Sequence, residues 1–348
     1  MPVAKIPGKS GKYVLVSGHY DGWYAGMTDN GIANVAMLDM ARVFMTNRDR
    51  LFRGVVFAWW SGHSDGRYAG SAWYLDNHFV DLQKNCVAHI NMDIAGCTGS
   101  DMVGFNTSLA EGGSYDREFL SAFNALPPPE PVAMARFADQ SFWGADVPFA
   151  IMPSFSVRDP KGPAFYWWHT PEDTLDKVDK KIMMRDAAVI TKLAVQFSLL
   201  DPLPADFPGF FNMMEGRLKD IKESLSPDFD LDPLFIKLGE LRQAVEALSQ
   251  TIAGKDGTDD TIIRVLWCLT RLVYTSGSPY SQDEAVGRGL FPVLSDAAGQ
   301  TPENTTPEYY LALRTAFKRQ TNRIEGEIAG LLEFIGAVIP QGKGIKSL

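Results

Sequence analysis

The sequence predicts an α/β fold in which a mostly parallel, mixed sheet is flanked by helices and followed by a C-terminal helical domain. Three observations lead to this prediction. Apolar segments rich in Val, Ile, Phe and Trp alternate with helical segments over residues 13–200. A proline-rich break follows at residues 201–208. Beyond it, apolar residues recur at helical spacing. We therefore expect one domain at residues 1–205 and a second at residues 206–348.

Strands and helices alternate in the first domain. The expected strands are Tyr13–Ser17, Gly54–Trp60, Cys86–Met92 and Phe149–Ser154. The expected helices are Asn30–Thr46, Gly66–Asn77, Ser114–Ala125 and Lys181–Leu199. Strands joined through helices pair in parallel, and ligands bind at the carboxyl ends of such strands. His19, the segment Ser61–Asp65 and Asp93 each follow a predicted strand, so we expect them at one edge of the sheet.

The second domain is expected to be a helical bundle that docks on the α/β domain or is paired through it. Its predicted helices are Phe211–Ser224, Pro233–Ile252 and Pro307–Ile335. One stripe of apolar residues at helical spacing consists of Leu234, Leu238, Leu241, Val245 and Leu248.

The composition excludes several classes of protein. Of the 348 residues, 45% are hydrophobic and 22% charged, which suffices for a sizeable core. The net charge of −9, without a Lys/Arg cluster, argues against a nucleic-acid partner. The three cysteines, Cys86, Cys97 and Cys268, are too scattered for a disulfide framework or a thiolate zinc site. No apolar run approaches the ~20 residues of a membrane span. The start of the chain lacks a signal-peptide core, so a cytoplasmic location is expected unless an N-terminal region is missing.

Two distant segments carry the residue types that bind zinc. One is Gly18-His19-Tyr20-Asp21, followed by Thr28-Asp29-Asn30-Gly31, and the other is Trp168–Thr174 with His169. A two-ion hydrolase needs imidazoles and carboxylates, with one carboxylate bridging ions about 3.5–4 Å apart. The full candidate ligand set is His19, Asp29, Asp93 and His169.

Each of these residues also has a structural explanation. A single histidine such as His19 is more often a hydrogen-bonded structural residue than a ligand. Asp29 precedes a predicted helix, where Asp is commonly an N-cap, and Asp93 can cap a turn. Thr170 with Asp173 has the spacing of a capping box. Only the ensemble indicates a metal centre.

The order of the motifs resembles the co-catalytic zinc aminopeptidase family, which includes the bacterial leucyl aminopeptidases, glutamate carboxypeptidase II and the transferrin receptor. The similar pieces, within about residues 12–200, are the two N-terminal motifs, Asn91-Met92-Asp93, His169–Asp176 and Gly70-Ser71. The resemblance implies that His19 binds one ion, that Asp29 bridges two, and that Asp93 and His169 complete the two sites. It further implies that Asp21 orients a ligand from outside the metal shell and that the Asp29-Asn30 peptide bond is cis.

One motif of that family is altered. Where relatives carry adjacent glutamates, a general base and a metal ligand, this chain has Ser61–Ser71 without a Glu-Glu pair. An ungapped match from Gly70 puts Ser64 at the base and Asp65 at the ligand, whereas one inserted residue puts His63 and Ser64 there. We favour His63 as the replacement, either as ligand or as base, with Asp65 second. The alternative is that His63 only caps the strand end.

The tryptophans near the motifs leave two explanations open. Some relatives have a tyrosine before the last histidine, where this chain has Trp168. Indole donates a single hydrogen bond, so oxyanion stabilisation is expected from elsewhere, such as Tyr166 or Arg67. Tryptophans in or beside the motif segments either wall an aromatic substrate pocket or fill the core; they are Trp23, Trp59, Trp60, Trp143, Trp167 and Trp168.

Two functions of different classes follow from these observations. The first is a metal-dependent hydrolase that cleaves an amide or peptide bond through a water activated by one or two Zn²⁺ ions. The altered base motif makes a small non-peptide amide or another acyl substrate an alternative to a peptide. The second is a catalytically silent homologue that serves as a binding or structural subunit. Because the first histidine motif begins only 18 residues in, an open sheet edge is expected. We therefore expect a homodimer, or a partner chain that supplies the missing N-terminal part.

Overall fold

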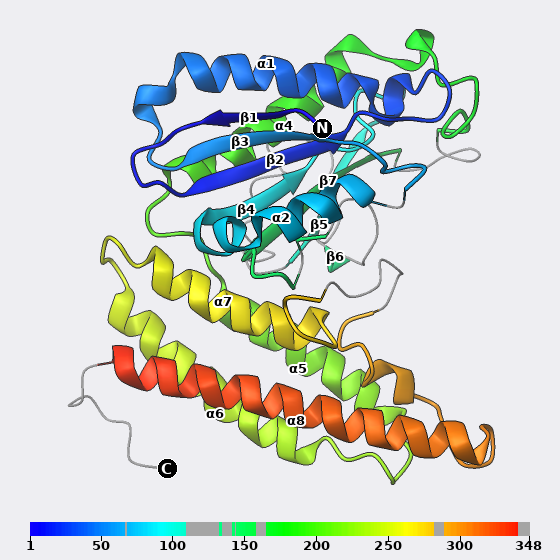
Figure 1. The fold of residues 1–348 in the computed structure, drawn as a ribbon, viewed down its shortest axis with the longest axis vertical. Coiled ribbons are helices and arrows are strands. Elements are labelled where there is room, and N and C mark those ends of the chain that lie inside the picture. Colours follow the sequence, from blue (N-terminus) through cyan, green and yellow to red (C-terminus); the bar gives the residue numbers. More distant parts are fainter. Residues whose placement is uncertain are drawn as a thin grey trace.

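The N-terminal part of the molecule is a mixed α/β sheet flanked by helices, as the sequence predicts (Figure 1). The computed structural model describes residues 1–66, 68–108, 132–133, 141–142, 144–157, 165–281 and 289–339. Within these residues the sheet has seven strands in the order β1-β3-β2-β4-β7-β5-β6. They are β1 (Val3–Ile6), β2 (Tyr13–His19), β3 (Gly54–Trp60), β4 (Cys86–Asn91), β5 (Met102–Thr107), β6 (Val132–Ala133) and β7 (Phe149–Ser156).

The central strands β3, β2, β4 and β7 run parallel to one another. β1 pairs antiparallel with β3, and β5 pairs antiparallel with β7. All four predicted strands are present, while β1, β5 and β6 are additional. β1 lies against β3 and is itself the outermost strand on this side of the sheet. The expected homodimer or partner chain stays a prediction.

The helices of the α/β part differ from the predicted ones mainly at their ends. α1 (Ile32–Thr46) starts two residues later than predicted, because Asp29 and Asn30 have non-helical backbone angles. α2 (Ala69–Asn85) follows Tyr68 and runs past the predicted end at Asn77. α4 (Lys180–Leu199) is capped by Asp179, whose side chain accepts from the backbone N–H groups of Lys181 and Ile182. The predicted helix Ser114–Ala125 lies outside the described residues.

Alternate residues of each strand point to opposite faces of the sheet. Val14, Val16 and Phe57 join one apolar cluster with residues of α1 and α4. Leu15, Ala58 and Trp60 join a second cluster, which includes Tyr74 and Leu75 of α2. The sheet is therefore covered on both faces, and the carboxyl ends of its parallel strands are left to form a site.

The C-terminal part is a helical bundle beside the sheet, again as predicted (Figure 1). It consists of α5 (Phe207–Glu223), α6 (Asp232–Ile252), α7 (Asp259–Tyr274) and α8 (Pro307–Val338). The apolar stripe predicted on α6 is buried. α7 was not predicted, although its apolar residues recur at helical spacing. In the described part of the chain, no helix is long and apolar enough to cross a membrane. The domain division near residue 205 stays a prediction.

A buried ion pair joins the two parts. The Arg53 side chain, directly before β3, is fully buried. Its Nε donates to Oδ2 of Asp259, the first residue of α7, at 2.9 Å. The guanidinium also donates to the carbonyl oxygens of Phe197 and Leu200, at the end of α4. These contacts fix the start of α7 to the start of β3 and the end of α4.

Candidate metal centre

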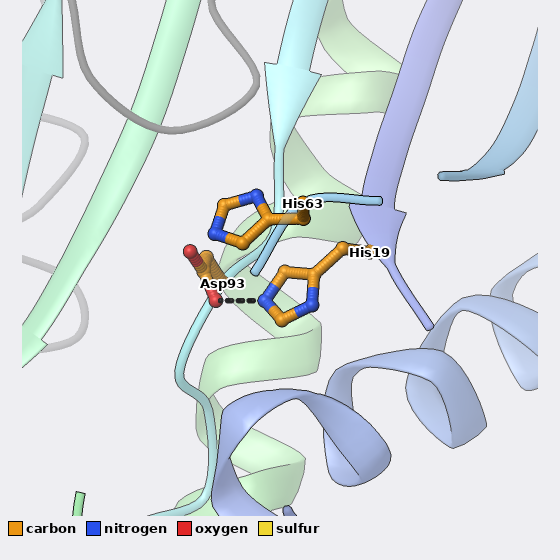
Figure 2. Close-up of side chains that lie close together, drawn as sticks. All are labelled: His19, His63 and Asp93. Atoms are coloured by element: carbon orange, nitrogen blue, oxygen red, sulfur yellow. Dashed lines mark hydrogen bonds and ion pairs between the residues drawn. The ribbon is translucent and has the colours of Figure 1, made fainter. Parts of the chain in front are cut away.

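Three metal-binding side chains meet at the carboxyl edge of the sheet (Figure 2). His19 is the last residue of β2, His63 follows β3, and Asp93 follows β4. These strands are neighbours in the sheet, so residues at their ends are brought together. One ligand atom from each residue lies within 4.8 Å of the others, and no other such group of three or more is found among the described residues. This combination of imidazole and carboxylate suits zinc.

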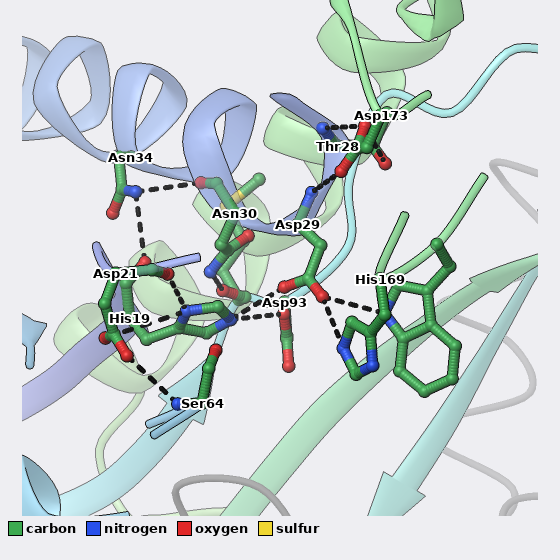
Figure 3. A network of polar contacts seen from close by, with 12 residues as sticks. His19, Asp21, Thr28, Asp29, Asn30, Asn34, Ser64, Asp93, His169 and Asp173 are labelled. Carbon is green, nitrogen blue, oxygen red and sulfur yellow. Dashed lines mark hydrogen bonds and ion pairs between the residues drawn. The ribbon is translucent and has the colours of Figure 1, made fainter. Parts of the chain in front are cut away.

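Asp29 lies beside this group and reaches two histidines (Figure 3). Its Oδ1 is 2.9 Å from Nε2 of His19, and its Oδ2 is 2.9 Å from Nε2 of His169. The Asp29-Asn30 peptide bond is cis, which confirms the prediction. Gly31, not Asp29, is the N-cap residue of α1. The Asp29 carboxylate instead connects the two histidine segments that lie far apart in the sequence.

The hydrogen bonds of His19 orient its ring for metal binding. Nδ1 lies 2.6 Å from the carbonyl oxygen of Asp21, so we assign the ring hydrogen to Nδ1. The Nε2 lone pair then faces Oδ1 of Asp29 at 2.9 Å and Oδ1 of Asp93 at 3.2 Å. Such convergence of lone pairs requires a cation among them. A proton or a metal ion satisfies this requirement, and a carbonyl partner on the far nitrogen is typical of ligating histidines.

Electrostatics at the site favour positive charge. Burial lowers the pKa of His19, but the charge of Asp93 and hydrogen bonds to Asp29 and Asp93 outweigh it and raise the pKa to about 11. For Asp93, burial raises the pKa, but the neighbouring imidazoles of His19 and His63 outweigh this and lower it. Both shifts have the same cause, the attraction between a negative charge on Asp93 and a positive charge at His19.

The segment that follows β3 contributes His63 to this group. The rings of His63 and His19 are stacked, with centroids 3.9 Å apart. The carboxylate of Asp21 accepts a hydrogen bond of 3.0 Å from the backbone N–H of Ser64, which holds this segment in place. Asp65 is exposed and does not belong to the group of metal-binding side chains. Of the proposed replacements, the structure therefore brings His63 into the site.

A set of hydrogen bonds that the sequence did not predict fixes the Asp29 turn. The buried carboxylate of Asp173 accepts from the N–H and hydroxyl of Thr28, at 2.8 and 2.9 Å, and from the N–H of Asp29 at 3.1 Å. The indole N–H of Trp167 donates to the Thr28 hydroxyl at 3.1 Å. Asp173 therefore anchors this turn, whereas its spacing from Thr170 had offered a capping box as an explanation.

The tryptophans divide between core and site. Trp59, Trp60 and Trp167 are buried. Trp23 and Trp168, which are 40% and 48% exposed, lie near His169 with ring centroids 5.9 and 3.9 Å from it. Core packing is therefore confirmed for the three buried rings, whereas an aromatic substrate pocket at Trp23 and Trp168 stays a prediction. Trp143 and Arg67 lie outside the described residues.

A family model describes most of the α/β region. The model of Peptidase family M28 matches residues 3–194 of the 348. The chain belongs to peptidase family M28. The segments that carry His19, His63 and His169 all fall within the matched region of this M28 chain.

Two curated relatives show how much of the chain is shared. Probable glutamate carboxypeptidase VP8 of Zea mays is 30% identical over 87 residues, 24% of this chain and 12% of that protein. Transferrin receptor protein 1 of Gallus gallus is 25% identical over 300 residues, 77% of this chain and 38% of that protein. This M28 chain thus spans less than half the length of either relative.

Solved structures of aminopeptidases are also similar. The zinc aminopeptidase BSAP from Bacillus subtilis has 19% identity and a TM-score of 0.48, over 56% of this chain and 48% of that one. The aminopeptidase from Aneurinibacillus sp. strain AM-1 has 20% identity and a TM-score of 0.44, over 56% and 47%.

Proposed function

We propose that this M28 chain is a metal-dependent hydrolase of an amide or peptide bond that holds zinc, or a similar divalent ion, beside His19. The observation that carries the proposal is the convergence of His19, His63 and Asp93, whose ligand atoms lie within 4.8 Å of one another. Membership of a peptidase family supports the reaction class. Because His19 is fully buried with two carboxylates at its Nε2, the residues fit a cation.

Each residue of the site has a part in this proposal. A bound zinc ion supplies Lewis acidity, which polarises a carbonyl and lowers the pKa of water. We assign His63 to the ligand set, because it lies in the same group as His19 and Asp93. Asp21 holds both His19 and the segment of His63 in place, since its carbonyl oxygen accepts from His19 and its carboxylate accepts from the backbone N–H of Ser64.

The substrate is expected to differ from that of an ordinary aminopeptidase. With His63 in the ligand set, the segment after β3 offers no carboxylate as a general base apart from the exposed Asp65. An amide or acyl compound with a good leaving group depends less on proton transfer than a peptide bond does. The exposed rings of Trp23 and Trp168 beside His169 suit an apolar or aromatic substituent.

Metal analysis of the purified chain tests this proposal. After zinc is supplied and excess is removed by dialysis, mass spectrometry of the metals should find at least about half an equivalent of bound ion, as a site with several protein ligands requires. His19→Ala should lose it. His78→Ala is the matched control, because His78 lies on α2 and contacts Trp73 and Tyr74 instead of the site. Turnover is then measured with aminoacyl 4-nitroanilides and simple amides. A wild-type chain that binds no metal would overturn the proposal.

A silent binding protein is the second candidate. The similarity to transferrin receptor protein 1 extends over 300 residues, which is longer than the region matched by the family model, residues 3–194. The similarity therefore reaches the helical bundle, and in this case the bundle is proposed to mediate dimerisation. Bound metal without turnover of any amide tested would favour this candidate over the hydrolase.

A further inference from the structure

The two oxygens of Asp29 face two unequal halves of the site (Figure 3). On the Oδ1 side, His19, His63 and Asp93 provide three ligand atoms within 4.8 Å of one another, and Oδ1 itself lies 2.9 Å from His19. On the Oδ2 side, His169 lies at 2.9 Å. No further His, Cys, Asp or Glu of the described residues completes a group of three with Asp29 and His169.

Two donors are too few for a zinc site of their own. Catalytic zinc ions in proteins have three protein ligands, and structural ones have four. The His19 half meets this requirement with three residues, before Asp29 is counted. The His169 half, among the described residues, does not.

Trp168 provides a second, independent reason against an ion on the Oδ2 side of Asp29. Its indole N–H donates to Oδ2 of Asp29 at 2.8 Å. An indole N–H is a donor only, so it occupies one lone-pair site of Oδ2 at every relevant pH. Nε2 of His169 approaches the same oxygen at 2.9 Å. When Nε2 donates its hydrogen to the remaining lone-pair site, it has no lone pair to offer an ion.

We propose that this chain binds a single metal ion, on the His19 side, and that Trp168 and His169 take the place of a second ion by donating hydrogen bonds to Oδ2 of Asp29. The inference rests on the proposed metal-dependent function. In this arrangement Asp29 is not a bridge, and Trp168 and His169 are positioning residues that orient its carboxylate toward His19.

Calorimetric titration of the metal-free full-length chain with zinc chloride tests the number of ions, and metal analysis after dialysis checks it. One equivalent is the expected result. Two equivalents with affinities within about tenfold of each other, a difference of about 1.4 kcal/mol, would overturn the single-ion proposal while supporting metal-dependent chemistry. No binding at all would overturn the proposed function, and the two failures are therefore distinguishable.

Substitutions separate the roles of the two halves. His169→Ala should still bind one equivalent, whereas a two-ion site would lose an ion. Trp168→Phe keeps an aromatic ring but removes the N–H, and it should bind one equivalent about tenfold more weakly, the lower end of effects seen for outer partners of metal ligands. Trp73→Phe is the matched control, because Trp73 is exposed on α2 and should not change zinc binding.

Nuclear magnetic resonance of the indole N–H groups gives a readout that does not depend on activity. The Trp168 signal is identified by its absence from the spectrum of Trp168→Phe. It should stay protected from exchange with solvent both before and after zinc is added, because the bond to Asp29 is kept. Loss of this protection on zinc binding would show that an ion displaces the indole from Oδ2, contrary to the proposal.

Discussion

The imidazole rings of His19 and His63 lie face to face, with centroids 3.9 Å apart and planes 7° from parallel. The pairing of β2 with β3 places His19 opposite Trp60, so the segment that continues from β3 passes directly over His19. Two protonated rings at this distance would repel each other. The stack therefore disfavours a positive charge on both rings at once, and an ion bound by nitrogens of both would leave both imidazoles neutral.

His63→Ala should weaken zinc binding by at least about 100-fold, the upper end of the range found when only an outer partner of a metal ligand is removed. The loss follows because His63 supplies one of three clustered ligand atoms. Calorimetric titration measures the effect. Unchanged affinity together with lost turnover would instead identify His63 as the base, the alternative role that the sequence allowed.

Asp173→Ala should destabilise the fold by about 1–3 kcal/mol, because buried donors of Thr28 and Asp29 lose their acceptor. It should also weaken zinc binding, since the same hydrogen bonds fix the Asp29 turn. Urea unfolding and zinc titration measure the two effects. Asp176→Ala is the control, because this carboxylate is exposed. Equal stability of the two variants would contradict the anchoring role of Asp173.

Arg53→Met should cost about 3–5 kcal/mol of unfolding free energy, because it leaves the buried Asp259 carboxylate without its charged partner. The double variant Arg53→Met/Asp259→Leu replaces both charged partners by apolar side chains and should recover part of the lost unfolding free energy. The comparison is Arg42→Met on α1, where the ion pair with Asp39 is largely exposed and worth at most about 1 kcal/mol. A similar loss from both single substitutions would argue against the joining role of Arg53.

His89 should make the protein less stable in acid. Burial lowers its pKa from 6.5 to about 3. Near pH 6 the imidazole is therefore partly protonated in the unfolded chain but stays neutral in the folded chain. The contribution of His89 to the unfolding free energy is fully present well above pH 6.5. It decreases as the pH falls, by about 2 kcal/mol at pH 5. His89→Gln should remove this dependence. The measurement is the difference in unfolding free energy between wild type and variant at pH 8 and pH 5; a difference that does not change with pH would contradict the assignment.

The sequence predicted the parts of the fold that depend on local pattern. The strand Gly54–Trp60 was predicted to the residue, because a β-rich apolar run with clear ends leaves little choice. The predicted apolar stripe on α6 was also confirmed, because all of its residues are buried. β1 was missed because four residues at a sheet edge, only one of them buried, carry too little pattern.

The site was harder to predict than the fold, because its contacts join distant segments. His19, Asp29 and His63 were candidates by residue type and position, but the stacking of His63 on His19 follows from strand order, which the sequence did not give directly. The Asp173 contacts to Thr28 and Asp29 span 145 and 144 residues. A carboxylate near a Thr-Pro-Glu segment carries no local sign of such a distant partner.

The anchoring of the Asp29 turn by Asp173 and Trp167 has a thermodynamic consequence. An unfolded chain cannot keep this turn anchored, because Asp173 lies 144 residues beyond Asp29, and it cannot hold His19 next to Asp93, 74 residues away. Zinc bound at the proposed site would therefore favour the folded chain over the unfolded one, and each tenfold increase of free zinc above its dissociation constant would add about 1.4 kcal/mol of stability. Under the proposed metal binding, the melting temperature is expected to rise with the concentration of free zinc and to fall when a chelator removes the ion.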